Sequence, residues 1–245
     1  MILNNIPILF NSFSKRKPFI DVCMHYYKRY LPEASIYLTI DNEIDLDYKI
    51  NLLTYDNIPT TSEYTYKCHS RYYRHYYTLH YLKSIGYTYV MNCMDDGWIT
   101  SVDFEKLNRS IDYIINNKAD RIDLTGPQIE YDCLYLDDYV SIVNPNNDLQ
   151  WYLTNQCSIW KIDSLLKIYD ILGPVADWEV EKIGSDVSRY IGCKFLTFNT
   201  PVIDNLGLFQ RTVGLYDKGK FLLEKYCIEN NMNYEIKLKQ FNSFL

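Results

Sequence analysis

The sequence has little glycine, only 9 among 245 residues, and no glycine-rich phosphate loop. Neither a Walker sequence nor a Gly-x-Gly-x-x-Gly run occurs, so phosphate binding by a glycine loop is unsupported. The Gly-x-Ser-x-Gly pattern around a nucleophilic serine is absent as well. The common glycine-based nucleotide and hydrolase motifs are therefore excluded.

An excess of positive charge is also lacking, because the formal net charge is −6 and the pI is about 5.2. A general nucleic-acid binder needs a basic surface, so we expect no nucleic-acid partner. The seven cysteines are odd in number and contain no C-x-x-C pair. We therefore expect reduced, mostly buried thiols in a cytosolic protein instead of a zinc site or disulfides.

No apolar run is long enough to span a bilayer. The segment "MILNNIPILFNSFSKRK" has its positive charges after a short apolar run, which is the wrong order for a signal peptide. We expect a cytoplasmic protein without a transmembrane segment. Peripheral attachment to a membrane or to a viral factory stays open.

What is present is a globular composition, 47% hydrophobic and 23% charged. Apolar patterning predicts alternating strands and helices in the first half. The strands are expected at 6–10, 35–40, 48–55, 87–94 and 121–126, and the helices at 19–31, 62–85 and 101–117. This alternation predicts an α/β fold with a mainly parallel central sheet flanked by helices.

The second half is less regular. Strands are expected at 139–144, 151–160, 194–199 and 210–216, and helices at 161–172, 177–185 and, as the terminal helix, 220–231. No repeat and no Gly-, Ser- or Pro-rich linker interrupts the chain. We therefore expect a single domain over 1–245.

Asp95 and Asp96 follow the apolar strand-like run "YTYVMNCM". In parallel sheets ligands bind outside the carboxyl ends of the strands, where Asp41 is also expected. Paired carboxylates there can bind Mg²⁺ or Mn²⁺ together with a substrate's phosphates. Asp-Asp-Gly is equally good turn chemistry, so a turn with solvated acids remains an even alternative.

A second acidic group, Asp177, Glu179 and Glu181, flanks Trp178. A carboxylate beside an apolar ring can have a raised pKa and act as a general base. Acids that complement the dipole on a first helical turn are the simpler alternative.

The remaining charged candidates have weaker patterns. The spacings of His69, His75 and His80 do not place two metal ligands on one helix face, so we expect surface or partly buried residues there, as for Arg71 and Arg74. Lys218 and Lys220 flank a glycine, and they fit either a diphosphate contact or a solvated turn.

Six segments occur in an order that resembles small GT-A-fold glycosyltransferases of bacteria and large DNA viruses, which use nucleotide-sugar donors. The segments cover most of the chain. They are "IPILFNSFSKRKPFIDVCMHYYKRYLP", "SIYLTIDN", "LKSIGYTYVMNCMDDGWITSVDFEKL", "NQCSIWKIDSLLKI", "DWEVEKIGS" and "DKGKF".

The resemblance implies a role for each matching position. Asp96, with Asp95, would hold Mn²⁺ or Mg²⁺ on the donor diphosphate, and Glu179, then Asp177, would be the general base. The implied donor contacts are Asn11, Ser12, Asp41, Asp95 and Lys220. The implied acceptor contacts are Gln156, Trp160 and Trp178. Residues 1–126 would bind the nucleotide sugar and residues 127–245 the glycan or glycoprotein acceptor.

Two positions depart from the family pattern: Met94 stands where a full D-x-D motif has an acid, and no histidine follows His80. We expect a metal-assisted glycosyltransferase. The alternatives are a catalytically weak or inactive module that binds a nucleotide sugar or glycan, and a sugar-phosphate nucleotidyltransferase. The latter should carry a basic, Gly-rich loop after its first strand, and "NSFSKRK" is basic but has no glycine.

Overall fold

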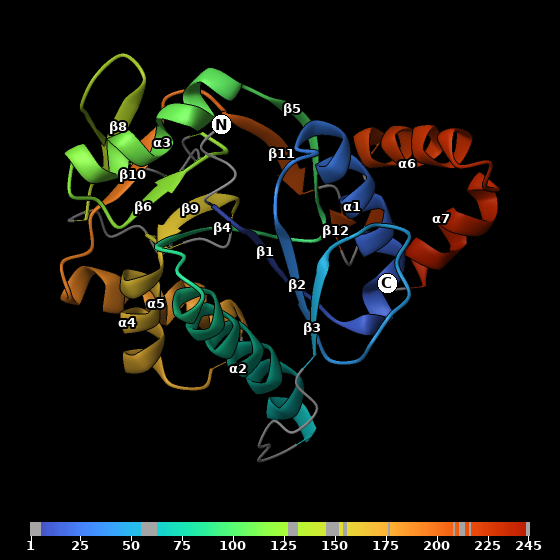
Figure 1. Ribbon diagram of the computed structural model, residues 1–245, viewed down its shortest axis with the longest axis horizontal. Coiled ribbons are helices and arrows are strands. Elements are labelled where there is room, and N and C mark those ends of the chain that lie inside the picture. Colours follow the sequence, from blue (N-terminus) through green and yellow to red (C-terminus); the bar gives the residue numbers. More distant parts are fainter. Residues whose placement is uncertain are drawn as a thin grey trace.

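The computed structural model describes residues 6–54, 63–126, 132–145, 152–153, 156–175, 177–207, 209–210, 214–215 and 217–243. These residues form an α/β domain around one large central sheet (Figure 1). The predicted α/β single domain is confirmed. No helix of these ranges combines the length and the apolar character that crossing a membrane requires.

Nine of the described strands build the central sheet in the order β3-β2-β1-β4-β9-β6-β10-β8-β7. Only β9 and β8 run against the others, so the sheet is mainly parallel, as predicted. The strands are β1 (Ile8–Asn11), β2 (Ile36–Ile40), β3 (Asn51–Thr54), β4 (Tyr89–Cys93), β6 (Arg121–Asp123), β7 (Cys133–Tyr135), β8 (Val140–Val143), β9 (Ser158–Lys161) and β10 (Phe195–Phe198).

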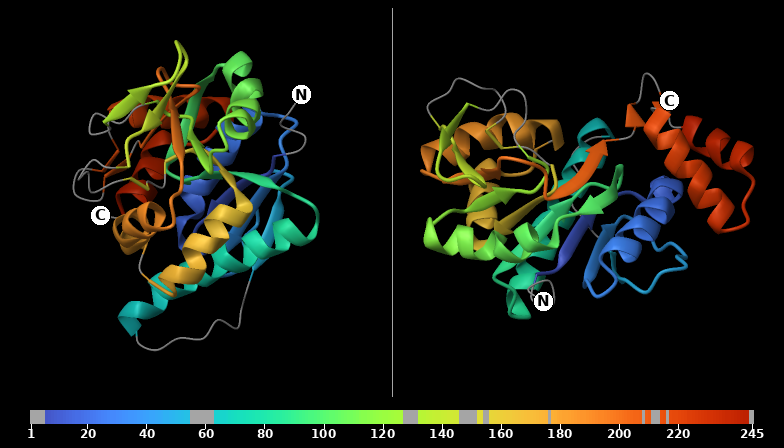
Figure 2. Two further views of the ribbon diagram at one scale, coloured as in Figure 1. Left: turned by 90° about the vertical axis from the view of Figure 1, so that its left-hand side faces the viewer. Right: turned by 90° about the horizontal axis from the view of Figure 1, so that it is seen from above.

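Alternation along the strands divides the core between the two faces of the sheet. Ile8 and Phe10 of β1 pack into the core that includes the helix α1, whereas Leu9 packs into the core that includes α2, α4 and α5. The helices are α1 (Lys17–Tyr30), α2 (Glu63–Ser84), α3 (Phe104–Asn116), α4 (Ile162–Leu172), α5 (Asp177–Tyr190), α6 (Asp217–Glu229) and α7 (Tyr234–Asn242). Figure 2 shows α6 and α7 beside α1 at one end of the molecule.

Several predicted elements need correction. The helix expected at 220–231 is not terminal, because α7 follows α6. Of the described residues in the strand expected at 151–160, only those from Ser158 on are in a strand, β9, while 151, 154 and 155 lie outside the described residues. The helix α5 continues to Tyr190, beyond the predicted 185. Asp103 caps α3 by accepting a hydrogen bond from the Lys106 amide at 3.1 Å, so this helix begins later than the predicted residue 101.

The segment after the Asp pair forms a strand that the patterning did not predict. β5 (Gly97–Val102) pairs with β11 (Ile203–Gly207), and β12 (Phe209–Gln210) pairs with β13 (Gly214–Leu215). The partner of β5 lies about a hundred residues away along the chain, so local sequence carries little signal for it.

Candidate active site

Polar side chains gather at one edge of the central sheet. Because β1, β2 and β4 are parallel, their carboxyl ends meet at this edge, and antiparallel β9 begins there. The edge therefore brings together the residues that follow β1, β2 and β4 with Gln156, which precedes β9. All of these positions were candidates from the sequence.

The Asp pair lies in a tight turn between β4 and β5. The Gly97 amide donates to the Met94 carbonyl at 3.2 Å and closes the turn. The side chain of Asp95 is only 1% exposed and that of Asp96 19% exposed, so the turn is not a solvated one. The segment is a turn, as one alternative from the sequence expected, but its acids are largely buried instead of solvated.

A single arginine bridges the two acids. Nε of Arg16 lies 3.1 Å from Oδ2 of Asp95, and its Nη2 lies 3.1 Å from Oδ2 of Asp96. The Ser12 hydroxyl also donates to Oδ2 of Asp95, while Oδ1 of Asp95 is buried without a hydrogen-bond partner among the described residues. Burial raises the pKa of Asp95, and the Asp96 charge adds to this, whereas Arg16 and the Ser12 hydrogen bond lower it.

The loop after β1 is tied to the ends of the neighbouring strands. The Ser12 amide donates to the Thr39 carbonyl at 3.0 Å, and the Ser14 amide donates to Oδ1 of Asp41 at 2.5 Å. Nδ2 of Asn11 donates to the Arg71 carbonyl at 2.8 Å. Backbone and side-chain bonds thus place Asn11, Ser12 and Asp41 at the same edge as the Asp pair.

Two arginines of α2 reach this loop, and sequence reasoning missed their placement. Arg74 is 1% exposed, and its Nη2 donates to the Ser12 carbonyl at 3.0 Å. Its guanidinium carbon lies 4.8 Å from the centre of the Phe13 ring, and that of Arg71 lies 5.9 Å from it. The expectation that Arg74 lies at or near the surface is wrong, because its charge is used to hold the β1 loop.

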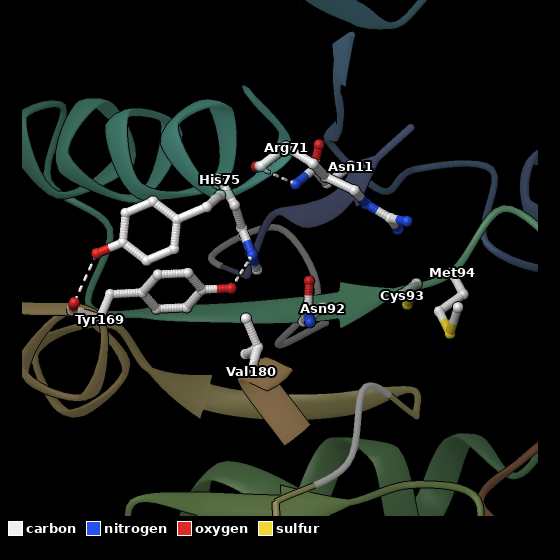
Figure 3. A pocket seen from close by; sticks show the side chains of 9 residues that line it. Asn11, Arg71, His75, Asn92, Cys93, Met94, Tyr169 and Val180 are labelled. Carbon is white, nitrogen blue, oxygen red and sulfur yellow. Dashed lines mark hydrogen bonds between the residues drawn. The ribbon is translucent and has the colours of Figure 1, made fainter. Parts of the chain in front are cut away.

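A cavity of about 60 Å³ opens between the sheet edge and α2, with room for a few water molecules (Figure 3). Oδ1 of Asn11 and Nε2 of His75 are both buried without a hydrogen-bond partner among the described residues. Both residues line the cavity. The lining residues are Asn11, Arg71, Tyr72, His75, Asn92, Cys93, Met94, Tyr169 and Val180.

His75 is not the surface or partly buried residue that the sequence suggested, because it is only 5% exposed. Its Nδ1 lies 2.7 Å from the Tyr169 hydroxyl. Burial lowers the pKa of His75 to about 3, and the Arg71 charge contributes in the same direction. The imidazole is therefore neutral at physiological pH.

Gln156 precedes the start of β9 by two residues, at the edge where β4 ends. The pairing of β4 with β9 ends at Asn92 opposite Ser158, and the sulfur atoms of the next residues, Cys93 and Cys157, lie 3.1 Å apart. The six described cysteines are free thiols and five of them are buried, as predicted.

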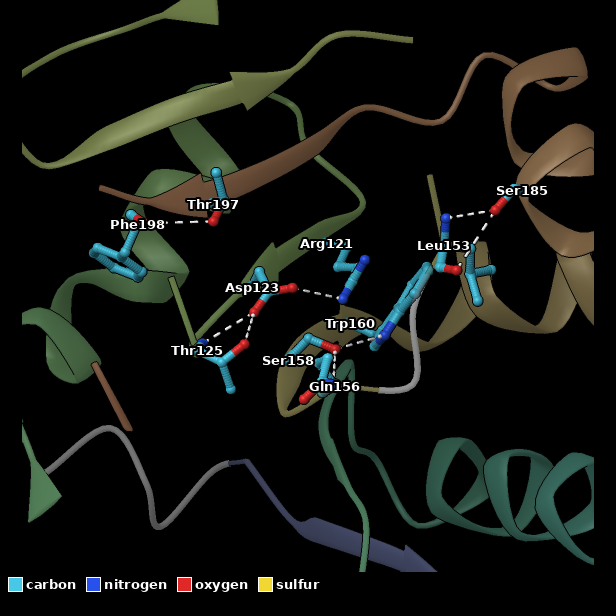
Figure 4. A network of polar contacts seen from close by, with 10 residues as sticks. All are labelled: Arg121, Asp123, Thr125, Leu153, Gln156, Ser158, Trp160, Ser185, Thr197 and Phe198. Atoms are coloured by element: carbon cyan, nitrogen blue, oxygen red, sulfur yellow. Dashed lines mark hydrogen bonds and ion pairs between the residues drawn. The ribbon is translucent and has the colours of Figure 1, made fainter. Parts of the chain in front are cut away.

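Trp160 lies in the core, where its side chain is 1% exposed. Its Nε1 donates to Oγ of Ser158 at 3.1 Å, and the Arg121 guanidinium lies 5.3 Å from its ring centre (Figure 4). The ring is not at the surface in this structure. Its predicted acceptor contact stays a prediction.

The other candidate residues lie on α5 and α6. Glu179 is partly exposed on the first turn of α5, next to Val180 of the cavity wall. The side chains of Asp177 and Trp178 lie outside the described residues. Lys220 is exposed on α6, where its Nζ lies 3.5 Å from Oδ1 of Asp217. Glu179 is thus the sequence neighbour of a cavity-lining residue, whereas no contact between described residues links Lys220 to the acid pair.

The Asp pair suits a divalent ion that arrives with a phosphate ligand. Mg²⁺ and Mn²⁺ are commonly bound by one or two carboxylates together with substrate phosphates. The unpartnered Oδ1 of Asp95 and the partly exposed carboxylate of Asp96 supply two such oxygens. Among the described residues, no three His, Cys, Asp or Glu side chains cluster as ligands of an ion.

No protein-family model matches the sequence, and no curated protein matches it. Solved structures match its fold. The chain is similar to a structure of S. aureus TarS, with a TM-score of 0.50 and 10% identity, over 98% of this chain and 42% of the TarS chain. At this identity the similarity shows the fold alone.

Two further structures are similar at lower TM-scores. A 1–349 fragment of S. aureus TarS in complex with UDP-GlcNAc has a TM-score of 0.49 and 14% identity, over 98% of this chain and 71% of the fragment. CMP:2-keto-3-deoxy-manno-octonic acid synthetase complexed with CTP has a TM-score of 0.47 and 12% identity, over 93% of this chain and 98% of the synthetase.

Proposed function

We propose that the protein is a glycosyltransferase of GT-A-like fold that moves a sugar from a nucleotide-sugar donor to a glycan or glycoprotein. One observation carries the proposal. The ends of β1, β2 and β4 present Asn11, Ser12, Asp41 and the Asp pair at one sheet edge, beside a cavity with unpartnered polar atoms. Such an edge is where α/β sheets bind nucleotides.

The proposed roles divide between the two halves of the chain, the first of which would bind the donor. Asp96 and Asp95 would hold Mn²⁺ or Mg²⁺, which neutralises charge on the departing nucleoside diphosphate. Asn11, Ser12 and Asp41 would bind the nucleoside, and Lys220 would contact the diphosphate. Residues 1–126 would thus supply the donor site.

The second half of the chain, residues 127–245, would bind the acceptor through Gln156, Trp160 and Trp178. Glu179, or Asp177 two residues earlier in α5, would accept the proton of the acceptor hydroxyl if the reaction inverts the anomeric centre. Glu179 is the first choice, because it is partly exposed and directly precedes Val180, which lines the cavity.

A sugar-phosphate nucleotidyltransferase is the second candidate, because the loop after β1 carries Lys15, Arg16 and Lys17 in succession. That enzyme would use such cations on a triphosphate. The two reactions release different products. Transfer or hydrolysis of a nucleotide sugar releases a nucleoside diphosphate or monophosphate, whereas nucleotidyl transfer from a nucleoside triphosphate releases pyrophosphate.

The test incubates the protein with Mn²⁺ and either a panel of nucleotide sugars or nucleoside triphosphates with sugar phosphates. We expect slow hydrolysis of one nucleotide sugar. Asp96→Asn should lower its rate about 10²–10³-fold, which is the usual effect of removing one electrostatic stabiliser of developing charge. Asp45→Asn removes the same charge from an exposed residue and is the matched control.

Three results would contradict the proposal. Release of pyrophosphate favours the nucleotidyltransferase, and binding of a donor without turnover, with any acceptor, favours a binding module. Unchanged hydrolysis by a folded Asp96→Asn variant would show that Asp96 does not hold the metal.

A further inference from the structure

In this structure the guanidinium of Arg16 is the cation that pairs with Asp95 and Asp96. Two different nitrogens of Arg16 contact one oxygen each of Asp95 and Asp96, both at 3.1 Å. The Arg16 side chain is only 17% exposed, and its guanidinium carbon lies 4.9 Å from the Phe19 ring centre. The contact is therefore a packed, two-pronged bridge, unlike a solvated surface pair of low energy.

The same carboxylates are the ones that a divalent ion would use. Like charges disfavour occupation of one small, weakly solvated site by both a guanidinium and a divalent ion. An ion that binds Oδ1 of Asp95 and the carboxylate of Asp96 would lie beside the guanidinium, and the repulsion between the two cations favours movement of Arg16 away from the acids. The reverse also holds, since Arg16 in its observed position opposes entry of the ion.

Arg16 has a second anionic destination once a donor is bound. It is the N-cap residue of α1, where the Lys17 amide donates to the Ser14 carbonyl and Pro18 has no N–H, so anion binding there depends on side-chain cations. Lys15, Arg71 and Arg74 surround the adjacent Phe13 ring at 4.8–5.9 Å. A diphosphate at this loop would thus attract the guanidinium that the ion releases.

We infer that Arg16 competes with the divalent ion for Asp95 and Asp96, and that it moves from the acids to the diphosphate when ion and donor bind together. This inference rests on the donor site of the proposed function. Its consequence is coupling: the ion alone binds weakly, and the ion and the diphosphate strengthen each other's binding by the same factor.

The first experiment measures the affinity of the full chain for Mn²⁺ alone, from the electron paramagnetic resonance signal of the free ion. Arg16→Gln should bind Mn²⁺ about 10- to 100-fold more tightly than the wild type, because hydrogen bonds between charged groups have that order of effect. Lys17→Gln is the matched control, since it removes the same charge from the next residue, whose ammonium pairs with Asp21 at 2.7 Å. Its Mn²⁺ affinity should stay close to that of the wild type.

The second experiment uses thermal unfolding with Mn²⁺, inorganic pyrophosphate or both. In the wild type the shift in Tm with both ligands should exceed the sum of the separate shifts. In Arg16→Gln, Mn²⁺ alone should raise Tm clearly and the surplus should shrink. Arg16→Lys retains the charge but not the two-pronged bridge, so its Mn²⁺ affinity should lie between those of the wild type and Arg16→Gln. This variant keeps the inference testable if Arg16→Gln fails to fold.

Equal or weaker Mn²⁺ binding by both Arg16 variants would overturn the inference, as would absence of Mn²⁺ binding in all of the proteins. These outcomes are separable from the proposed function. Hydrolysis of a nucleotide sugar without tighter binding by the variants refutes the competition alone. Tighter binding by the variants without turnover of any nucleotide sugar refutes the proposed activity alone.

Discussion

His75 should lower the free energy of unfolding of the protein in mild acid, because it is neutral in the folded protein and protonated in the unfolded chain. Burial lowers the pKa of this imidazole to about 3, whereas the unfolded chain has the ordinary value of 6.5. Between these values the unfolded state binds more protons than the folded state. Stability therefore rises with pH across this window, and it falls as the pH is lowered through 6.5 toward 3.

The magnitude at pH 5 depends on the unfolded state alone, because a folded-state pKa of about 3 leaves His75 neutral there. Protonation of the unfolded imidazole then removes about 2 kcal/mol between pH 7.5 and pH 5, from RT ln(1 + 10^1.5) with the ordinary histidine value.

The assay is urea unfolding at pH 7.5 and at pH 5 for the wild type and for His75→Gln, which retains a polar group opposite the Tyr169 hydroxyl. The wild type should lose about 2 kcal/mol more than the variant, since every other titrating group contributes equally to both proteins. His80→Gln, at an exposed position of the same helix, should behave as the wild type. Equal losses in wild type and His75→Gln would show that the folded protein protonates or solvates His75, and would refute the argument.

Two further predictions concern the fold. Arg121 and Asp123 form a buried ion pair at 2.9 Å, with both side chains 1% exposed. Asp123→Leu alone should lower the free energy of unfolding by about 3–5 kcal/mol in chemical unfolding, because it leaves Arg121 buried without its partner charge, and adding Arg121→Met should recover part of that loss. No recovery in the double variant would contradict this account. Gly126 has φ of +82° and Gly86 has φ of +98°, so an alanine at either position should lower the unfolding free energy through backbone strain, by about 1 kcal/mol at Gly86. The loss should be larger at Gly126, because an added Cβ would lie 3.2 Å from Pro201 there, whereas at Gly86 it meets nothing within 4 Å. Equal losses would show that the Pro201 contact is harmless.

Much of the fold was predictable because its elements bury regular apolar patterns. The run at 19–31 has helical spacing, and it forms α1 (Lys17–Tyr30). The short apolar run at 6–10 overlaps β1 (Ile8–Asn11), which is buried on both faces in the interior of the sheet. Elements whose partners are distant in sequence were less predictable, as β5 shows, since its pairing with β11 has no local signature.

The acidic half of the candidate site was also predictable, but the cationic half was not. Asp95 and Asp96 follow an apolar strand, and that position marks them as candidates in a parallel sheet. Arg16 and Arg74 gave no comparable signal, because their roles depend on how α1 and α2 dock against the sheet. The basic run "SKRK" after the first strand was the one available sign of Arg16.

The interleaved order of the central sheet has a consequence for how the chain can be divided and assembled. β4, which leads into the acid pair, has β1 on one side and the much later β9 on the other. β6 closes the first half of the sequence, yet both of its neighbours, β9 and β10, come from the second half. During synthesis, when β6 has just left the ribosome, β4 has an unpaired edge and β6 has neither of its partner strands. Such edges can pair with strands of other chains, so the two halves of the sequence form one folding unit, which is complete only after β10 has left the ribosome.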